Sequence, residues 1–364
     1  MTDGESASLS AQLTQRIRAA IAAEGGWLPF DRYMAMALYE PGLGYYAHGG
    51  RKFGAMPASG SDFITAPEMS PLFGRALAVQ VQQALVACGG GQVWEFGAGS
   101  GALAAQLLQA LGDQVSAYHV VELSAALRQR QAERLAPWAG RVQWHDRLPG
   151  RIDGVVLGNE VLDAMPVQLL HWDGAQWLER GVVAAAEGFG WQDRPTALRP
   201  PVEGFVPGTV VEIHRQAEAF VRTLAGQMGR AAAFFIDYGF PEAEYYHPQR
   251  TAGTLMCHRA HLADTDPLAE VGLKDITAHV NFTGIALAAQ DAGLQVLGYT
   301  SQARFLLNCG LATLLHEADI KQAVAAQRLV HEHEMGELFK VIGLAAGVEL
   351  DAIGFAAGDR SHRL

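Results

Sequence analysis

The chain has 364 residues with a formal net charge of −11, and 49% of its residues are hydrophobic while 18% are charged. These values are typical of a globular protein with a sizeable core and exclude an intrinsically disordered chain. The acidic balance, without a dense run of Lys and Arg, argues against nucleic acid as a partner and favours a basic acceptor.

The cysteines and the first residues of the chain indicate the cellular compartment of the protein. The three cysteines, Cys88, Cys257 and Cys309, lie far apart and form neither a disulfide framework nor a metal-ligand spacing. The first residues include acids where a targeting peptide carries basic residues, and no apolar run approaches bilayer length. We therefore expect a cytoplasmic protein that does not insert into a membrane.

The first part of the chain predicts helices. Apolar residues recur every four positions at Leu9, Leu13, Ile17 and Ile21. This spacing predicts an amphipathic helix over 8–24. A second helix is expected over 29–39, followed by a mobile loop over 47–61. Ser70 is the predicted cap of a third helix that begins at Pro71 and runs to about residue 88.

From residue 92 onward, expected strands and helices alternate. The expected strands are 93–96, 117–122, 141–145 and 154–157, and the expected helices are 102–111 and 124–135. Such βαβ alternation predicts a parallel sheet with helices on both faces.

An insertion interrupts this alternation after Pro166. A hairpin with Asp173-Gly174 at its turn is expected over 167–183, and the insertion continues to about residue 210. The elements expected after it are helix 215–228, strand 232–238, helix 285–292, strand 294–300 and helices over 301–345.

A Gly-rich turn follows the first of the alternating strands. Its sequence is Glu95-Phe96-Gly97-Ala98-Gly99-Ser100-Gly101. Glycines at a strand-to-helix turn let the backbone approach a ligand closely. Glu122 ends the next strand, where a carboxylate can accept both ribose hydroxyls of an adenosine. The residues predicted to bind S-adenosylmethionine here are Glu95, Gly97, Ala98, Gly99, Gly101, Glu122 and Leu123.

Two alternatives compete with this interpretation. The same residues match the glycine-rich dinucleotide-binding motif if Ala102 occupies the position of its last glycine. This match would indicate a NAD-dependent oxidoreductase. Glu95 argues against it, because a carboxylate there would lie near the pyrophosphate, whereas it suits the ammonium of a methionine moiety. A plain βα turn without a ligand is the second alternative. Asp146, after the third strand, is a further candidate for the adenine amino group or a simple turn residue.

Several longer motifs resemble a known family. They are Tyr33-Met34 through Tyr39, Gly44-Tyr45-Tyr46, Asp62–Pro71, Gly158-Asn159-Glu160-Val161-Leu162-Asp163-Ala164-Met165-Pro166-Val167 and Phe235-Ile236-Asp237-Tyr238-Gly239. From about residue 27 to about residue 310, the chain resembles the MidA family, which includes the mitochondrial complex I assembly-factor arginine methyltransferases. The resemblance implies an α/β fold with a Rossmann-like, seven-stranded class I methyltransferase sheet that binds S-adenosylmethionine. It also implies a protein arginine acceptor, with a respiratory-complex subunit as a partner, although no transit peptide is expected here.

The expected organisation follows from the elements and the resemblance together. Residues 1–88 are expected to form N-terminal helices with a lid-like loop, and residues 89–300 a methyltransferase domain with a β-rich insertion at about 167–210. Residues 301–364 are expected to form a C-terminal helical segment. Its apolar residues, such as Phe305, need a covering neighbour, either from the same chain or from a second copy in a homodimer.

Glu160 and Asp163 are the candidate catalytic residues. An arginine acceptor needs carboxylates that grip its guanidinium, and these acids follow the fourth strand at the ligand-binding edge of the sheet. If residues 160–163 form a helical turn, the two acids share a face. The alternatives are that Asp163 caps a helix and Glu160 faces solvent, or that one of the two acids holds the hairpin. Asn159 is expected to contact the methyl donor.

The segment before the third helix supplies further candidates. Thr65, Pro67 and Glu68 are expected to fold over the cofactor as part of a lid, although Glu68 could instead complement the helix dipole. Aromatic residues that could wall the pocket are Tyr45, Tyr46 and Phe63. No metal is expected, because the histidines lack a metal-binding spacing. A binding or assembly factor that uses the donor fold to hold a partner is the remaining functional alternative.

Overall fold

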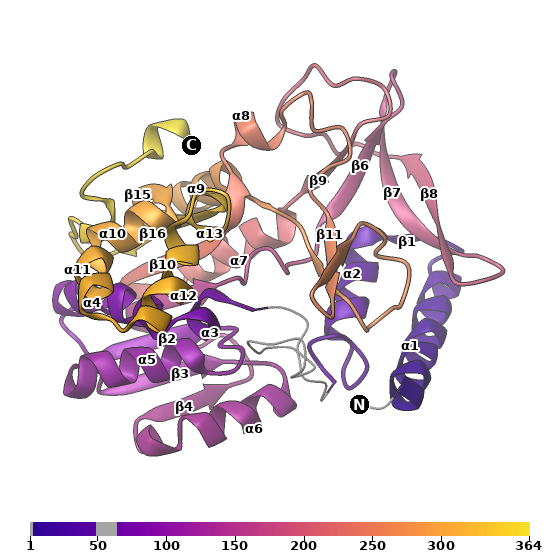
Figure 1. Cartoon of the computed structure of the whole chain (residues 1–364). Helices are drawn as coiled ribbons and strands as arrows, with labels where there is room; N and C mark the ends of the chain where they lie inside the picture. Colours follow the sequence, from indigo (N-terminus) through magenta and orange to yellow (C-terminus); the bar gives the residue numbers. More distant parts are fainter. Residues whose placement is uncertain (1–2, 49–63) are drawn as a thin grey trace.

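The computed structural model describes residues 3–48 and 64–364. A large central sheet with helices on both faces lies beside an accessory lobe that contains two smaller sheets (Figure 1). Most of the loop expected over 47–61, as well as Phe63, lies outside the described residues.

The central sheet is mainly parallel, as predicted. Its strands, in spatial order, are β15 (Gln295–Ser301), β16 (Phe339–Ala346), β10 (Met228–Phe240), β5 (Ile152–Asn159), β2 (Gln92–Phe96), β3 (Ala117–Val121) and β4 (Val142–His145). The pairs from β10 to β4 are all parallel. The resemblance implied seven strands, and the sheet has eight, because the two-residue strand β14 (Val280–Asn281) pairs with the end of β10.

The prediction that residues 301–345 are all helical is wrong at its end. Helices occupy this region only as far as residue 338, and β16 then runs antiparallel between β10 and β15. The β16 sequence is a short, almost entirely buried apolar run. Periodicity alone cannot distinguish such a run from a buried helical turn.

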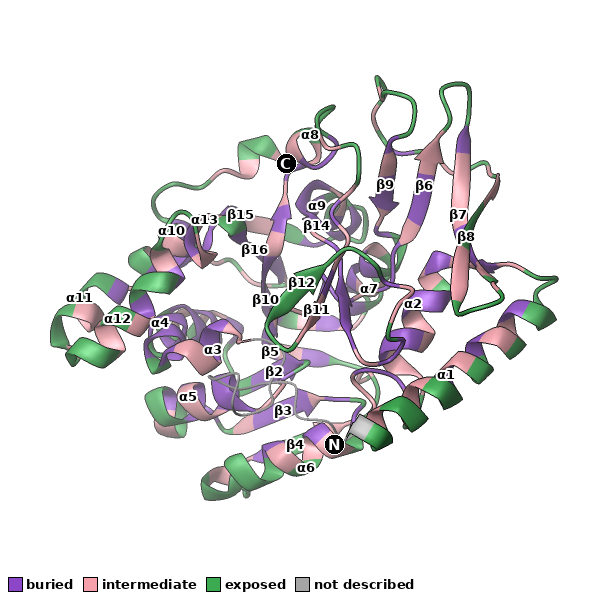
Figure 2. Cartoon of the chain, turned by 45° about the vertical axis from the view of Figure 1, so that its right-hand side comes forward, coloured by how far each residue is buried: buried purple, intermediate pink, exposed green. Residues whose placement is uncertain are grey.

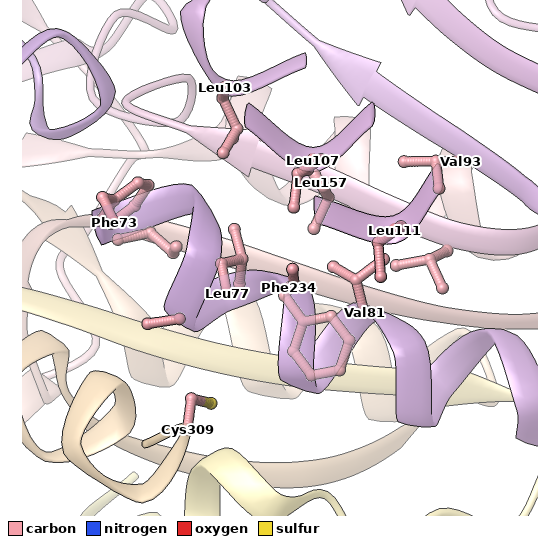
Figure 3. Packing of buried hydrophobic residues seen from close by; sticks show 14 of the residues in the cluster. Phe73, Leu77, Val81, Val93, Leu103, Leu107, Leu111, Leu157, Phe234 and Cys309 are labelled. Carbon is pink, nitrogen blue, oxygen red and sulfur yellow. The ribbon is translucent and has the colours of Figure 1, made fainter. Parts of the chain in front are cut away.

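Helices cover both faces of the central sheet. One face carries α4 (Pro71–Cys88), α5 (Ala102–Leu111), α10 (Gln302–Asn308), α11 (Leu311–Glu317) and α12 (Ile320–Val330). The other face carries α7 (Arg215–Ala225) and α9 (Phe282–Asp291). Figure 3 shows the first of these two cores, where Phe73, Leu77 and Val81 of α4 lie against Leu107 of α5 and Phe234 of β10.

Local capping follows the sequence signals. The Ser70 side chain accepts the N–H of Leu72 at 3.3 Å, and the α4 helix begins at Pro71 as predicted. Ser124 likewise accepts the N–H of Leu127 at 3.3 Å and starts α6 (Ala125–Arg134). Both caps satisfy N–H groups that the first helical turn leaves without partners.

The predicted hairpin is present in a sheet of five strands. These are β1 (Leu28–Pro29), β6 (Gln168–Trp172), β7 (Trp177–Ala184), β8 (Phe189–Pro195) and β9 (Val210–Ile213). Asp173 stabilises the hairpin turn, because its Oδ1 accepts the N–H groups of Ala175 and Gln176, each at 2.7 Å. Strand β1 joins this sheet by pairing with β7, so the N-terminal region is tied to the insertion.

The accessory lobe has its own core. We define this lobe as α1 (Asp3–Ala23), α2 (Phe30–Tyr39), the five-stranded sheet and a three-stranded sheet. The strands of the three-stranded sheet, which the sequence pattern did not reveal, are β11 (Met256–Arg259), β12 (Leu262–Asp264) and β13 (Asp275–Thr277). Leu13 and Ile17 of α1 are fully buried in this core, while the opposite side of α1 is exposed (Figure 2).

Several short helices complete the chain: α3 (Ala66–Met69), α8 (Glu242–Tyr245) and α13 (Met335–Leu338). Of these, α3 lies directly before α4 and contacts α5 and α12. Within residues 3–48 and 64–364, no helix has the length and apolar character needed to cross a bilayer.

Candidate functional site

A cavity of about 1180 Å³ opens at the carboxyl ends of the central strands. The residues that directly follow β2, β3 and β5 line it, namely Gly97, Glu122 and Glu160. Parallel sheets place ligand sites at this edge, because each strand delivers the loop that follows it to the same side. Residues of the accessory lobe, including Tyr39 and Asp275, close the cavity from the other side.

The Gly-rich turn forms one wall of the cavity. Gly97, Gly99 and Gly101 all have positive φ, at 61°, 54° and 79°. Side chains strain such a backbone, so the turn requires glycine. A Cβ at Gly97 would also meet Cγ2 of Val161 at 3.2 Å. Gly97, Ala98 and Gly99 line the cavity, whereas Gly101 does not and packs against Gln131.

Glu122 is fixed at the cavity wall by hydrogen bonds. One of its oxygens accepts the N–H of Ser124 at 2.9 Å, and the other accepts the amide of Gln131 at 3.2 Å. Burial raises the pKa of the Glu122 carboxyl, and these hydrogen bonds oppose the rise. The carboxylate is therefore presented to the cavity in a fixed orientation.

Gln131 is a site residue that the sequence analysis missed. It is fully buried, and its amide nitrogen donates both to Glu122 and to the carbonyl of Gly99, the latter at 2.9 Å. The Nε1 of Trp144 donates to the Gln131 carbonyl at 3.1 Å. Gln131 thus joins the Gly-rich turn to the acid after β3. Its position on α6 gave no signal, because a glutamine in a helix ordinarily faces solvent.

Glu95 lines the cavity below the turn and is only 3% exposed. The Tyr118 hydroxyl donates to its Oε2 at 2.6 Å. Burial raises the pKa of Glu95 to about 7, the Tyr118 bond lowers it, and the nearby Glu122 raises it further. A buried carboxyl of this kind is stabilised in its charged form by a cation, such as an ammonium group.

The residues predicted to cover the cofactor differ in their positions relative to the cavity. Thr65 and Pro67 line the cavity, but Glu68 does not. Glu68 instead bonds to the Ser100 hydroxyl and to Nη1 of Arg134, the latter at 2.7 Å. These contacts connect α3, the Gly-rich turn and α6, and Glu68 makes them from outside the cavity.

Of the remaining candidate donor-site residues, Leu123 and Asn159 line the cavity and Asp146 does not. Leu123 lines the cavity and is 68% exposed, so its side chain is available to a ligand. Asp146 is exposed and outside the lining, whereas the next residues, Arg147 and Leu148, belong to it. Asn159 lines the cavity and donates to Oε1 of Glu160 at 3.1 Å. Among the described residues, Asn159 Oδ1 has no hydrogen-bond partner.

The residues around the turn fit S-adenosylmethionine. The glycine cradle leaves room where a Cβ would intrude, Glu122 is held ready for hydroxyl groups, and the buried Glu95 is suited to an ammonium. When bound, this cofactor supplies a methyl group on a sulfonium sulfur. The chain's own contribution is to position donor and acceptor and to exclude water.

Glu160 and Asp163 lie together in the same cavity, but not on a helical turn as the sequence analysis considered. Residues 160–163 form a loop in which Glu160 has a φ of 54°. The physical reason is Asp237 on β10. The Asp237 Oδ2 accepts the backbone N–H groups of the three residues that follow Glu160. These are Val161, Leu162 and Asp163, at 3.1, 2.9 and 3.2 Å.

Asp163 has an unusual environment. Its side chain is 3% exposed, and its Oδ1 has no hydrogen-bond partner among the described residues. Asp163 is not a helix cap, because no helix lies between β5 and β6. Burial and the nearby Asp237 and Asp275 raise its pKa well above the usual range. Burial and Asp163 also raise the pKa of Glu160, to about 8. Such a group of buried acids favours a cationic ligand.

The accessory lobe adds residues that the sequence analysis did not bring together. Tyr46 lines the cavity as predicted, whereas Tyr45 is buried outside the lining. Tyr39 also lines it, and its hydroxyl donates to the carbonyl of Ala164 at 2.8 Å. Asp275, from β13, was not predicted. No local motif marks it, because the three-stranded sheet alone brings it to the cavity.

A metal site finds no support in the described parts of the chain. No group of three or more His, Cys, Asp or Glu side chains is arranged there to hold an ion. His258 lines the cavity on β11, but His261 lies in the following turn and is exposed.

Comparison with known proteins gives a consistent result. Residues 72–300 match the family described as "Putative S-adenosyl-L-methionine-dependent methyltransferase". The crystal structure of a protein from Burkholderia thailandensis bound to S-adenosyl-homocysteine is 50% identical, with a TM-score of 0.96 over 100% of this chain and 99% of that one.

Curated relatives are more distant but extend along most of the chain. "Protein arginine methyltransferase NDUFAF7, mitochondrial" from Danio rerio is 28% identical, over 91% of this chain and 84% of the relative. The Drosophila melanogaster homolog is 27% identical, over 92% and 85%. S-adenosylmethionine is thus confirmed as the cofactor over the dinucleotide alternative. The chain belongs to the MidA family and is an S-adenosylmethionine-dependent methyltransferase.

Proposed function

We propose that the protein transfers methyl groups to arginine side chains of a protein acceptor. The observation that carries this proposal is the buried Oδ1 of Asp163, which has no hydrogen-bond partner among residues 3–48 and 64–364 and lies in the cavity that the Gly-rich turn also lines. A guanidinium supplies the N–H donors and the positive charge that this oxygen lacks. The curated relatives that are named protein arginine methyltransferases support the same acceptor.

The electrostatics of the site favour arginine over lysine. Burial raises the pKa of Glu160 and Asp163, so a cation among them is needed to keep both carboxylates charged near neutral pH. An arginine side chain remains charged in such a site, whereas a buried lysine readily loses its proton. The planar guanidinium also matches two carboxylates through paired hydrogen bonds.

Methyl transfer to arginine must release one proton. An acceptor nitrogen forms a bond to the methyl carbon as the carbon–sulfur bond breaks, and the sulfur keeps the electron pair. The nitrogen loses a proton, so the methylated guanidinium keeps a single positive charge. Glu160 and Asp163 are the carboxylates placed to orient the acceptor and to accept that proton.

The test is a set of matched peptides with labelled methyl donor. Acetyl-Gly-Gly-Arg-Gly-Gly-amide is compared with the same peptide carrying Lys or citrulline, and methylation is measured by mass spectrometry. We expect transfer to the Arg peptide alone, and a large loss of transfer in Glu160→Gln and Asp163→Asn. Asp264→Asn, on the surface of β12 and outside the cavity, is the matched control.

Two outcomes would contradict the proposal. Transfer to the Lys peptide at an equal rate would show that the acids select charge but not the guanidinium. If no arginine of any protein in a cell extract receives label, the acceptor class is wrong. On the family resemblance, a respiratory-complex subunit is the first whole protein to test.

A further inference from the structure

The side-chain amide of Gln131 lies behind the cavity wall that the Gly-rich turn and Glu122 form. Gln131 belongs to α6, is fully buried and is not part of the cavity lining. Its Nε2 donates to the carbonyl of Gly99 at 2.9 Å and to Oε2 of Glu122 at 3.2 Å. Its Oε1 accepts the indole N–H of Trp144 at 3.1 Å. The nitrogen and the oxygen of the amide are thus both used within the protein, so Gln131 acts on its neighbours and not on a ligand.

Trp144 fixes the direction in which this amide faces. The indole N–H of Trp144, on β4, can only donate, so it requires the oxygen of Gln131 and excludes the nitrogen. The amide nitrogen must then face Gly99 and Glu122, which both offer acceptors. A reversed amide would set donor against donor at Trp144 and oxygen against oxygen at the other two residues. A buried network in which every group is paired holds its members rigidly.

Glu122 gains a fixed carboxylate plane from this network. The N–H of Ser124 bonds to Oε1 and the amide of Gln131 bonds to Oε2, at 2.9 and 3.2 Å. A single bond would leave the carboxylate free to turn, whereas bonds to both oxygens set its plane. Each oxygen keeps a lone pair for a further donor. Since Glu122 lines the cavity, we expect these lone pairs to meet the ribose hydroxyls of the cofactor in one set direction.

The same amide also orients the Gly-rich turn. Gln131 holds the carbonyl of Gly99, and a trans peptide directs its C=O and N–H to opposite sides, so the N–H of Ser100 is set as well. Arg134, one turn further along α6, donates to the Ser100 hydroxyl at 2.7 Å. Residues three apart on a helix share a face. One face of α6 therefore holds two successive residues of the turn.

We propose that Gln131 is the positioning residue of the donor site and that it sets the preference of the site for the ribose hydroxyl groups of S-adenosylmethionine. It acts through Glu122, whose carboxylate it fixes at the cavity wall, and through the carbonyl of Gly99. This role rests on the expected contact between Glu122 and the ribose. It does not depend on the identity of the methyl acceptor.

A purely structural role is the competing explanation. In that case the amide of Gln131 only pairs buried polar groups, and its loss would lower the free energy of unfolding without changing which ligand is preferred. Variants at this position are expected to fold, because α6 keeps its Ser124 cap and the contacts of Arg134. Ligand discrimination separates the two roles, since a change in stability alone does not alter it.

The probes are S-adenosylhomocysteine and its 2′-deoxy counterpart, with the Kd of each measured by calorimetry on the full chain. The wild-type protein should bind the 2′-deoxy compound about tenfold or more weakly, as for loss of one hydrogen bond to a carboxylate. In Gln131→Met, the Kd of S-adenosylhomocysteine should rise about fivefold to fiftyfold, and the preference for the 2′-hydroxyl should fall to about threefold or less. Gln129→Met makes the same change at an exposed position of α6 and should match wild type.

A double variant tests whether Gln131 acts through Glu122. If it does, Gln131→Met should raise the Kd of S-adenosylhomocysteine by a smaller factor in Glu122→Ala than in wild type, because the residue that it positions is already gone. Trp144→Phe is an independent check, because it keeps Gln131 but removes the N–H that sets the direction of its amide. We expect a smaller loss of preference for the 2′-hydroxyl in that variant.

Three results would overturn this role of Gln131. The first is a folded Gln131→Met variant that keeps the wild-type preference for the 2′-hydroxyl, and the second is an equal effect of Gln131→Met in wild type and in Glu122→Ala. The third is a wild-type protein that binds both compounds equally. Should Gln131→Met fail to fold, an unchanged preference in Trp144→Phe would overturn the role instead. None of these measurements involves an acceptor, so their failure leaves the proposed arginine acceptor untouched.

Discussion

The carboxylate of Asp237 accepts the backbone N–H of Asp163 at 3.2 Å, so strand β10 directly holds the loop that follows the neighbouring strand β5. The same oxygen accepts two further N–H groups of that loop. Asp237 therefore shapes the acceptor side of the cavity without lining it. Burial and Glu160 raise the pKa of Asp237 to about 8, and the N–H bonds oppose this rise.

Replacing Asp237 with Asn tests this positioning role. The amide leaves a buried N–H group of the loop poorly paired, which is expected to destabilise the protein by about 1–3 kcal/mol. We expect kcat to fall by more than about tenfold, because Glu160 and Asp163 move, while the donor Kd remains close to wild type. Urea unfolding and donor calorimetry measure the two effects. Asp173→Asn, which changes another backbone-capping acid far from the cavity, should retain full activity.

Donor binding is predicted to depend on Glu122 and Gly99. Glu122 is the acid that we expect to accept the ribose hydroxyls, so in Glu122→Ala the S-adenosylmethionine Kd should rise about tenfold to a hundredfold. Gly99→Val strains a backbone with φ of 54° and projects into the cavity, so donor binding should be lost. Calorimetry checks both. Glu133→Ala, an exposed change on the same helix as Gln131, is the control. Donor binding that survives in both site variants would mean that the cofactor lies elsewhere.

Acceptor affinity should increase with pH. Glu160 has a raised pKa of about 8, so it is mostly protonated at neutral pH in the free protein. A guanidinium binds the carboxylate form best, and the acceptor KM should therefore fall as pH rises through 8. In Glu160→Gln this part of the pH dependence should disappear. The measurement is KM for the Arg peptide from about pH 6 to about pH 9.5, and a wild-type KM that is flat over this interval would contradict it.

The stability of the free protein should change with pH in the opposite direction. The pKa of Glu160 is raised from 4.5 to about 8 on folding, so between these values the folded state binds more protons than the unfolded state. The free energy of unfolding then falls as pH rises through this interval. Glu160→Gln removes this pH-dependent fall in the free energy of unfolding. The variant should therefore melt at a higher temperature than wild type at pH 8, while it binds the acceptor less well. Thermal unfolding at several pH values, without ligands, tests the sign.

The contacts of Glu68 predict an effect on product release. Arg134→Ala removes the ion pair with Glu68 and the bond to Ser100 that hold α3 against the Gly-rich turn. A partly exposed ion pair contributes up to about 1 kcal/mol, so the dissociation rate of S-adenosylhomocysteine should rise about two- to fivefold. Stopped-flow fluorescence measures that rate. Arg32→Ala, which breaks a surface ion pair in the accessory lobe, should leave it unchanged.

Much of the donor side was predictable because its signals are contiguous in sequence. The Gly-rich turn sits between a short apolar strand and a helix, and Glu122 occupies the matching position after the next strand. The Gly-rich turn and the position of Glu122 both depend on local backbone geometry, and the residue types at these positions indicate that geometry directly. The hairpin at Asp173 and the caps at Ser70 and Ser124 were predictable for the same reason.

The acceptor side was only half predictable. Glu160 and Asp163 follow a strand, but their loop is shaped by Asp237, whose partners lie more than seventy positions away in the sequence. Asp275 reaches the cavity through the small β11–β13 sheet, which has short strands and no clear alternation. Pairings of this kind are decided by tertiary packing and leave no periodic pattern in the sequence.

The place of β16 has a consequence for how the chain is made. This strand is the last of the central sheet to be synthesised, yet it lies between β10 and β15 rather than at the edge. Until the ribosome has released residues 339–346, the growing chain carries β10 and β15 without the strand that joins them. Exposed strand edges attract other chains, so an arrested or shortened product would be prone to aggregate. The methyltransferase sheet can thus be completed only late in the synthesis of the chain.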